Sequence, residues 1–152
     1  MYSVYRSDNV EPIRKFAIEF TNTLGIDCDP DYYLKRWRVF IETKIGVLWY
    51  LEHDEEIVGG IGGIVAPDVL SGKDTMVELF WYVTPSHRKR GIVLFNEMAK
   101  YVKEHNLRWA MVHMEKSMPD KLKTFYTKEG FKLLETHWVQ SFTMFGDLGV
   151  LI

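Results

Sequence analysis

The fold is decided by residues 76–102, which read MVELFWYVTPSHRKRGIVLFNEMAKYV. The segment 76–83 is an apolar run rich in aromatic and β-branched residues, and Thr84-Pro85-Ser86 interrupts it, which predicts a buried strand. Beyond a glycine-centred turn, apolar side chains recur at steps of three, four and three, as on one face of an amphipathic helix. These side chains are Ile92, Phe95, Ala99 and Val102. The stretch therefore predicts a strand, a basic turn and a helix in direct succession.

The turn between these two elements has the properties of an anion site. Gly91 permits backbone dihedrals or close approaches that a Cβ would forbid, and free N–H groups at the start of the following helix point back toward it. Aligned amides carry roughly half a positive charge at a helix N-terminus. Arg88, Lys89 and Arg90 add full positive charges beside them. A phosphate or pyrophosphate group is therefore expected to bind here.

Length and composition limit the class of protein. The 152 residues suit a single domain, 1–152, and the one cysteine, Cys28, excludes an intrachain disulfide framework. No run approaches the ~20 apolar residues of a membrane span, and the N-terminus lacks the build of a signal peptide, so we expect a cytoplasmic protein with no membrane partner. A net charge of −2 argues against nucleic acid as a partner. Contact of the basic turn with DNA stays as a minor alternative.

The rest of the chain predicts strands and helices in alternation. The further strands are expected at 1–6, 47–52, 57–65, 108–114, 131–135 and 137–145. The further helices are expected from about Pro12 to Gly25, from Pro30 to Gly46 and from Ser117 to Gly130. The glycine run 59–63 lies within a strand, where glycines mark a bend or the close approach of another backbone or a ligand.

Two stretches of the chain resemble the signatures of one family. Residues 83–93, VTPSHRKRGIV, resemble the acyl-CoA signature of the GNAT superfamily of N-acyltransferases, Arg/Gln-x-x-Gly-x-Gly/Ala, in which Arg88 and Gly91 match and Val93 replaces Gly or Ala. Residues 125–131, FYTKEGF, resemble the Leu-Tyr-x-Lys-x-Gly-Phe of the same family. The order of the predicted elements matches that family over essentially the whole chain. The resemblance implies an α/β (α+β) fold with a central mixed, mostly antiparallel sheet of about seven strands and about four flanking helices.

The resemblance also implies the ligands. Acetyl-CoA is the expected co-substrate, with no metal, and the acceptor is an amine-bearing small molecule or protein. The amides that would hold the pyrophosphate belong to Arg88, Lys89, Arg90, Gly91, Ile92 and Val93. The backbone at Tyr82 and Val83 would pair with the pantetheine arm like an added strand. A monomer or a homodimer is expected.

Transfer of an acetyl group to an amine needs a base for the amine and an acid for the departing thiolate. The resemblance places Tyr126 as the acid, and the alternative role for this tyrosine is core packing. Glu78 is the expected base, and the alternative is a solvated or ion-paired carboxylate. In a regular strand Glu78 faces with Phe80 and Tyr82, whereas a bulge would change its direction. His113 is the reserve base.

A second function remains open beside acetyl transfer. Val93 stands where the family keeps a small residue, and Pro119 stands where the family often has an asparagine that contacts CoA. Both departures are compatible with a catalytically degenerate GNAT-fold module that binds or interacts without transferring an acyl group.

Overall fold

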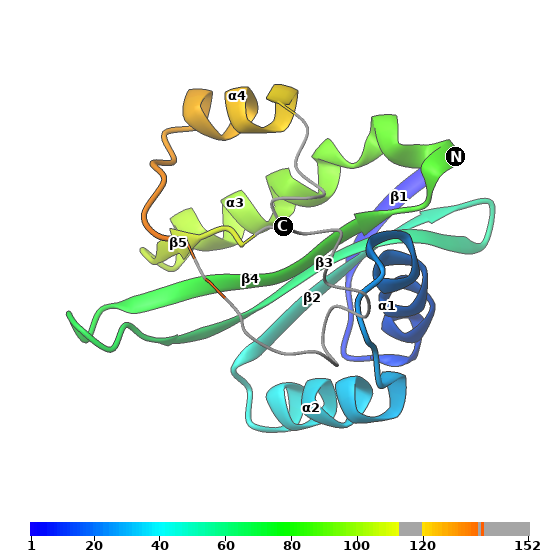
Figure 1. Cartoon of the computed structure of the whole chain (residues 1–152), viewed down its shortest axis with the longest axis horizontal. Coiled ribbons are helices and arrows are strands. Elements are labelled where there is room, and N and C mark those ends of the chain that lie inside the picture. Colours follow the sequence, from blue (N-terminus) through cyan, green and yellow to red (C-terminus); the bar gives the residue numbers. More distant parts are fainter. Residues whose placement is uncertain (113–119, 137, 139–152) are drawn as a thin grey trace. The chain divides into compact units, whose positions relative to one another are not determined.

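The computed structural model describes residues 1–112, 120–136 and 138, and within these the chain divides into two compact units (Figure 1). The first comprises residues 1–20 and 28–112. The second comprises residues 21–27 and the described residues that follow Val112. The elements in chain order are β1 (Tyr2–Arg6), α1 (Glu11–Leu24), α2 (Pro30–Glu42), β2 (Gly46–His53), β3 (Glu56–Pro67), β4 (Asp74–Val83), the 3₁₀ helix η1 (Pro85–Arg90), α3 (Ile92–Glu104), β5 (Arg108–Ala110) and α4 (Asp120–Lys128).

The first unit is built on a sheet whose strands follow chain order, β1-β2-β3-β4-β5 (Figure 1). The first four strands pair antiparallel and β5 joins β4 in parallel, so the sheet is mixed and mostly antiparallel, as predicted. β2 and β3 form a hairpin with a two-residue loop, Asp54–Glu55, in which both residues have positive φ. A parallel neighbour requires a crossover, and α3 supplies it between β4 and β5.

Helices cover both faces of this sheet and divide the core in two (Figure 1). On one face α3 buries Leu94 and Met98 against the side chains of β2, β3 and β4. On the other, α1 and α2 bury a cluster around Trp37. The start of α2 follows the predicted capping chemistry, because the Asp29 side chain accepts the amide N–H of Tyr32 and Pro30 occupies the first turn. No helix among the described residues is long and apolar enough to cross a bilayer.

The predicted count of about seven strands is too high for the residues that the structure describes, which hold five. Residues 131–135 form no strand, and Leu133 and Leu134 are 82% and 78% exposed. A strand needs a backbone partner, and the partner expected at 137–145 lies outside the described residues except for residue 138. β5 ends at Ala110, so it is also shorter than the predicted strand at 108–114.

The predicted inner face of α3 is wrong at one position. Ile92 is 41% exposed, whereas Leu94, Phe95 and Met98 are fully buried. Both stripes of this helix are apolar, so periodicity alone does not choose between them. The buried face is centred on Leu94, Phe95 and Met98, and Ile92 lies at its margin.

Candidate active site

The part of β4 that leads to the basic turn has one neighbouring strand, β3, among the described residues. β3 pairs with β4 from Asp74 to Val83, but β5 pairs with it only over residues 75–77. From Glu78 to Val83, no strand among the described residues occupies the side of β4 that faces away from β3. We call residues 78–83 on this side the outer edge of β4. The edge of a strand with one neighbouring strand can offer main-chain N–H and C=O groups to an extended ligand.

This outer edge runs directly into the basic turn. η1 follows β4 after Thr84, and Gly91 then caps α3. Gly91 has a φ of −58°, so its backbone conformation is open to any residue. A Cβ there would instead lie 3.2 Å from Val83 Cγ2 and 3.3 Å from the carbonyl oxygen of Arg88. Of the two reasons for a glycine at this turn, the structure therefore supports close approach.

The three cations of the turn are exposed, and two of them have defined contacts. Arg88 Nε donates to the carbonyl oxygen of Val83 at 3.2 Å, which braces the turn against the end of β4. The Arg90 guanidinium lies 5.0 Å from the ring centroid of Tyr2, within the range of a cation–π contact. The amides of Ile92 and Val93 lie in the first turn of α3, where amide N–H groups have no acceptor within the helix, whereas the Leu94 amide donates to the carbonyl oxygen of Gly91 at 3.1 Å. The positive end of the α3 dipole and the basic side chains therefore lie together at the turn before α3.

Val93 is half-buried and packs against the core cluster on the α3 face. Its methyl groups therefore have a place in the protein interior. Ile92, one residue earlier, is the more exposed of the two.

Glu78 is the most deeply buried charged residue among those described, with 3% of its surface exposed. Gly62 pairs with Phe80 and Gly63 with Glu78, so Leu79 is an extra residue in β4 and forms a bulge. Paired residues share a face of the sheet and neighbouring residues of β3 alternate, so Glu78 and Phe80 point to opposite sides. Because of the bulge, the Glu78 side chain points to the opposite face of the sheet from the one that a regular strand would give it.

The Glu78 carboxylate lies where β4 and β5 separate. Its Oε2 accepts the amide N–H of Val112 at 3.1 Å, two residues beyond the end of β5. This side-chain bond lies just beyond the last pair of β4 and β5, which joins Val77 to Ala110. Burial raises the pKa of Glu78 to about 8, although the hydrogen bond from Val112 acts in the opposite direction. A carboxyl group with this pKa takes up and releases protons near neutral pH.

Tyr82 is held by a carboxylate that sequence analysis did not identify. Its hydroxyl donates to Glu19 Oε2 on α1 at 2.8 Å, and its ring lies 5.5 Å from that of Phe16. Burial raises its pKa, and the bond to Glu19 raises it further. Burial also raises the pKa of Tyr33 on α2, to which the charge of Glu78 adds. No spacing in the sequence relates Glu19 or Tyr33 to β4, because the contacts are made between distant segments.

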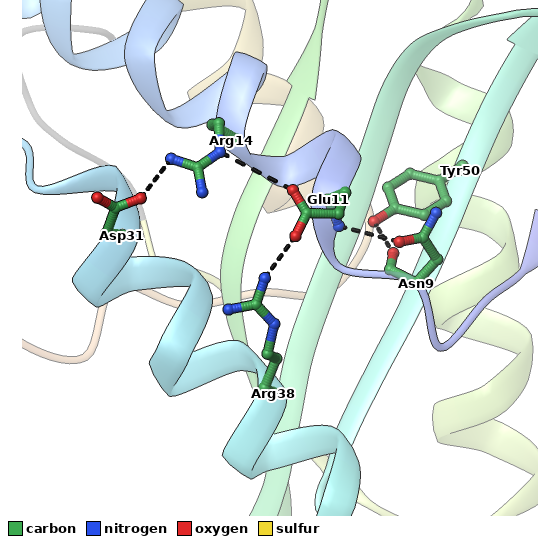
Figure 2. A network of polar contacts seen from close by, with 6 residues as sticks. All are labelled: Asn9, Glu11, Arg14, Asp31, Arg38 and Tyr50. Atoms are coloured by element: carbon green, nitrogen blue, oxygen red, sulfur yellow. Dashed lines mark hydrogen bonds and ion pairs between the residues drawn. The ribbon is translucent and has the colours of Figure 1, made fainter.

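The acidic residues near the start of α2, which include Asp29 and Asp31, have structural partners. Figure 2 shows Arg14 between Glu11 and Asp31, and Arg38 of α2 bonded to Glu11 of α1. These pairs are solvent-exposed, and each such pair contributes about 0–1 kcal/mol. They support a role in joining α1 to α2.

The other predicted catalytic residue, Tyr126, lies on α4 in the second unit and is described with that unit alone. Its ring contacts Phe131 at 5.5 Å between centroids, and its carbonyl oxygen accepts the amide N–H of Phe131 at 3.0 Å. Glu78, Tyr82, Val83 and the turn 88–93 all belong to the first unit. The reserve base His113 lies outside the described residues.

Comparisons with known proteins agree on the class of fold. An acetyltransferase of the GCN5-related N-acetyltransferase group from Ralstonia eutropha JMP134 is 18% identical, with a TM-score of 0.75, over 93% of this chain and 99% of that one. An acetyltransferase from Clostridium acetobutylicum, solved with acetyl-CoA, is 14% identical, with a TM-score of 0.72, over 93% and 97% of the two chains. A ribosomal-protein-alanine N-acetyltransferase from Brucella melitensis biovar Abortus 2308 is 15% identical, with a TM-score of 0.64, over 93% and 99%.

No curated protein sequence matches the chain. Residues 11–131, however, match the Acetyltransferase (GNAT) family. This match spans most of the 152 residues, including β4, the basic turn and α4. The chain therefore belongs to the GNAT family of acetyltransferases.

Proposed function

We propose that this protein moves an acetyl group from acetyl-CoA to a primary amine, by direct attack within a ternary complex and without a covalent enzyme intermediate. The observation that supports the proposal best is the continuity between the outer edge of β4, the Gly91 turn and the N-terminus of α3. A strand edge suits an extended amide-bearing chain, and a helix N-terminus suits a phosphate. Acetyl-CoA carries these two features in that order, a pantetheine arm followed by a pyrophosphate.

In this proposal the backbone of Tyr82 and Val83 bonds to pantetheine, and the amides of residues 88–93 bond to the pyrophosphate. Arg88 has a second role, since its bond to the Val83 carbonyl fixes the turn relative to the strand. Val93 is compatible with cofactor binding, because its side chain packs into the core cluster. This packing favours the enzyme over the degenerate binding module.

The chemistry follows from the two predicted catalytic residues. A primary amine with a pKa near 10.4 is mostly protonated at pH 7, so it must lose a proton before its nitrogen attacks the thioester carbon. Ionised Glu78 takes that proton, directly or through a water molecule. A backbone N–H of β4 stabilises the oxyanion that forms. The carbon–sulfur bond then breaks as the Tyr126 hydroxyl gives its proton to the departing sulfur. The second proton of the attacking nitrogen passes through water to the Tyr126 phenolate, which leaves a neutral amide and the CoA thiol.

The acceptor is proposed to be an amine on a small molecule or on a protein, and the protein is proposed to act as a monomer or homodimer. The GNAT-family relative from Brucella carries a name that specifies a protein acceptor, whereas other acetyltransferases of this fold from soil metagenomes are named for aminoglycosides. Both acceptor types therefore belong in a first screen.

Cofactor binding is the first test, because it needs no knowledge of the acceptor. In calorimetric titrations we expect acetyl-CoA and desulfo-CoA to bind with Kd values near micromolar, about −8 kcal/mol. Release of the CoA thiol should then depend on an amine from a mixed panel, and Tyr126→Phe should lower it. Absence of binding at millimolar acetyl-CoA would contradict the proposal and favour the interaction module. Equal background release by wild type and Tyr126→Phe would refute catalysis.

A further inference from the structure

We propose that Gly63 of β3 is a positioning residue for Glu78. The absence of a side chain at Gly63 lets the β4 backbone approach β3 closely and bulge at Leu79, which turns the Glu78 carboxylate into the space between β4 and β5. The inference rests on the proposed role of Glu78 as the base. Gly63 itself touches neither substrate nor cofactor in this proposal, and it acts only through the β4 backbone.

The space that a side chain at Gly63 would need is already filled by backbone. A Cβ there would lie 2.5 Å from the carbonyl oxygen of Val77 and 3.1 Å from its carbonyl carbon, with Met76 Sδ at 2.9 Å. Real Cβ atoms essentially never approach other heavy atoms within 3.0 Å. A flexible side chain yields to such crowding by changing its rotamer, but a strand backbone paired on both sides does not. Gly63 is therefore required here for close approach.

The backbone atoms that a Cβ at Gly63 would contact belong to the residue next to Glu78. Val77 directly precedes Glu78, and it is also the last residue of β4 that pairs with β5, opposite Ala110. The bond from the Val112 amide to Glu78 lies just beyond this last pair. A displacement of Val77 therefore moves both the carboxylate and the strand that holds it. A methyl group at Gly63 is expected to loosen or break the contact between Glu78 and Val112.

Gly62 offers a matched control. A Cβ at Gly62 would lie 2.7 Å from Trp37 Cη2, 2.8 Å from Phe80 Cε1 and 3.2 Å from Leu48 Cδ1. The crowding is as severe as at Gly63, but all three atoms belong to side chains, and they lie on the opposite face of the sheet. Gly62→Ala thus adds the same methyl group next to the same bulge without pressing on the backbone that precedes Glu78.

The direct readout is the titration of Glu78 itself. In protein labelled with ¹³C at the glutamate carboxyl carbon, the Glu78 signal is assigned by its loss in Glu78→Gln and then followed by NMR against pH. We expect the midpoint to fall by about one pH unit or more in Gly63→Ala, because a displaced carboxylate gains water. Gly62→Ala should keep the wild-type midpoint. This measurement needs no acceptor and no catalysis.

The pH profile of amine-dependent thiol release is the second readout. Gly63→Ala should move the profile in the same direction as the NMR midpoint, and it should have no further effect on the profile in a Glu78→Gln background. A shifted NMR midpoint in protein that lacks transferase activity would refute acetyl transfer while leaving the positioning of Glu78 supported. A wild-type midpoint in folded Gly63→Ala would overturn the inference. So would a Gly63→Ala chain that fails to fold beside a folded Gly62→Ala, since Gly63 would then serve the fold alone.

Discussion

At the scale of single residues, the burial of Glu78 has a consequence for stability that is independent of catalysis. The pKa of its carboxyl group rises from 4.5, the ordinary value, to about 8 in the folded protein. The folded chain therefore holds this proton more tightly than the unfolded chain does. Folding is favoured while the group is protonated in the folded state, and the advantage is lost as the pH rises toward 8. A hydrophobic residue at this position would not titrate, so it would not cause this loss of stability as the pH rises.

The free energy of unfolding of the wild type should fall between about pH 4.5 and about pH 8 as a result of Glu78 alone. The slope from one group is at most about 1.4 kcal/mol per pH unit. Glu78→Gln removes the titrating group and should remove this part of the pH dependence, which urea unfolding at several pH values measures. Taking the difference between the two proteins cancels the contributions of the other ionisable groups. Parallel curves for the two proteins would contradict the burial of an ionisable Glu78.

Val93 gives a second prediction at this scale. Because its side chain packs against the α3-side core, Val93→Ala should lower the free energy of unfolding by about 1 kcal/mol. The Kd for acetyl-CoA should change by less than about fivefold, since less than about 1 kcal/mol of binding energy is then involved. Thermal unfolding and calorimetric titration measure the two effects separately. A much larger gain in affinity would mean that Val93 obstructs the cofactor, as in a degenerate site.

At the scale of elements, most of the first unit could be predicted from the sequence. The β2–β3 hairpin, the capped start of α2 and the strand–turn–helix around Gly91 each depend on local signals, namely polar loop residues, an Asp-Pro pair and a glycine. The bulge at Leu79 depends on a long-range fit between Gly63 and Val77, which no local pattern encodes. For the same reason the sequence indicated Glu78 as a site residue without fixing the side to which it points.

The β2–β3 loop has non-glycine residues at positions where glycine is usually favoured, and this allows the cost of their backbone conformation to be tested. Asp54 and Glu55 have φ values of 48° and 66°, in the left-handed region where glycine is favoured and where a Cβ costs about 1 kcal/mol. Glu55→Gly should therefore raise the free energy of unfolding by about 0.5–1 kcal/mol. Glu56→Gly, one residue later and inside β3, should lower it by a similar amount. Urea unfolding of both variants measures the pair, and effects of the same sign would refute the argument from φ.

At the scale of the whole molecule, overall charge and local charge have opposite signs. The chain carries a net charge of −2, yet Arg88, Lys89 and Arg90 are gathered beside the positive end of α3. Attraction of an anionic cofactor is therefore expected chiefly from this region, because without its three cations the net charge of −2 becomes −2 − 3 = −5 for the other residues. At 0.1 M ionic strength salt largely screens exposed charges that lie more than about 10 Å apart, so distance from the region decides which charges contribute.

Two pairs of basic residues, one just before α3 and one in its later turns, allow the effect of local charge to be tested in two double variants that have the same net charge. Removing Lys89 and Arg90 together changes the net charge from −2 to −4, and removing Lys100 and Lys103 does the same. The second pair lies in the later turns of α3, roughly 12–18 Å along the axis from its N-terminus at about 1.5 Å per residue. Lys89→Ala/Arg90→Ala should weaken acetyl-CoA binding by about tenfold for each charge-assisted hydrogen bond that it removes, at about 1.5 kcal/mol each. Lys100→Ala/Lys103→Ala should stay close to wild type.

Calorimetric titrations at several potassium chloride concentrations complete the comparison. Acetyl-CoA binding to the wild type should weaken as salt rises, and this dependence should be smaller in Lys89→Ala/Arg90→Ala than in Lys100→Ala/Lys103→Ala. Equal losses of affinity in the two double variants would show that net charge attracts the cofactor, which would remove the main electrostatic argument for the turn at Gly91. Unequal losses would place the cofactor's phosphates at the N-terminal end of α3, where the exposed cations lie beside the positive end of the helix dipole.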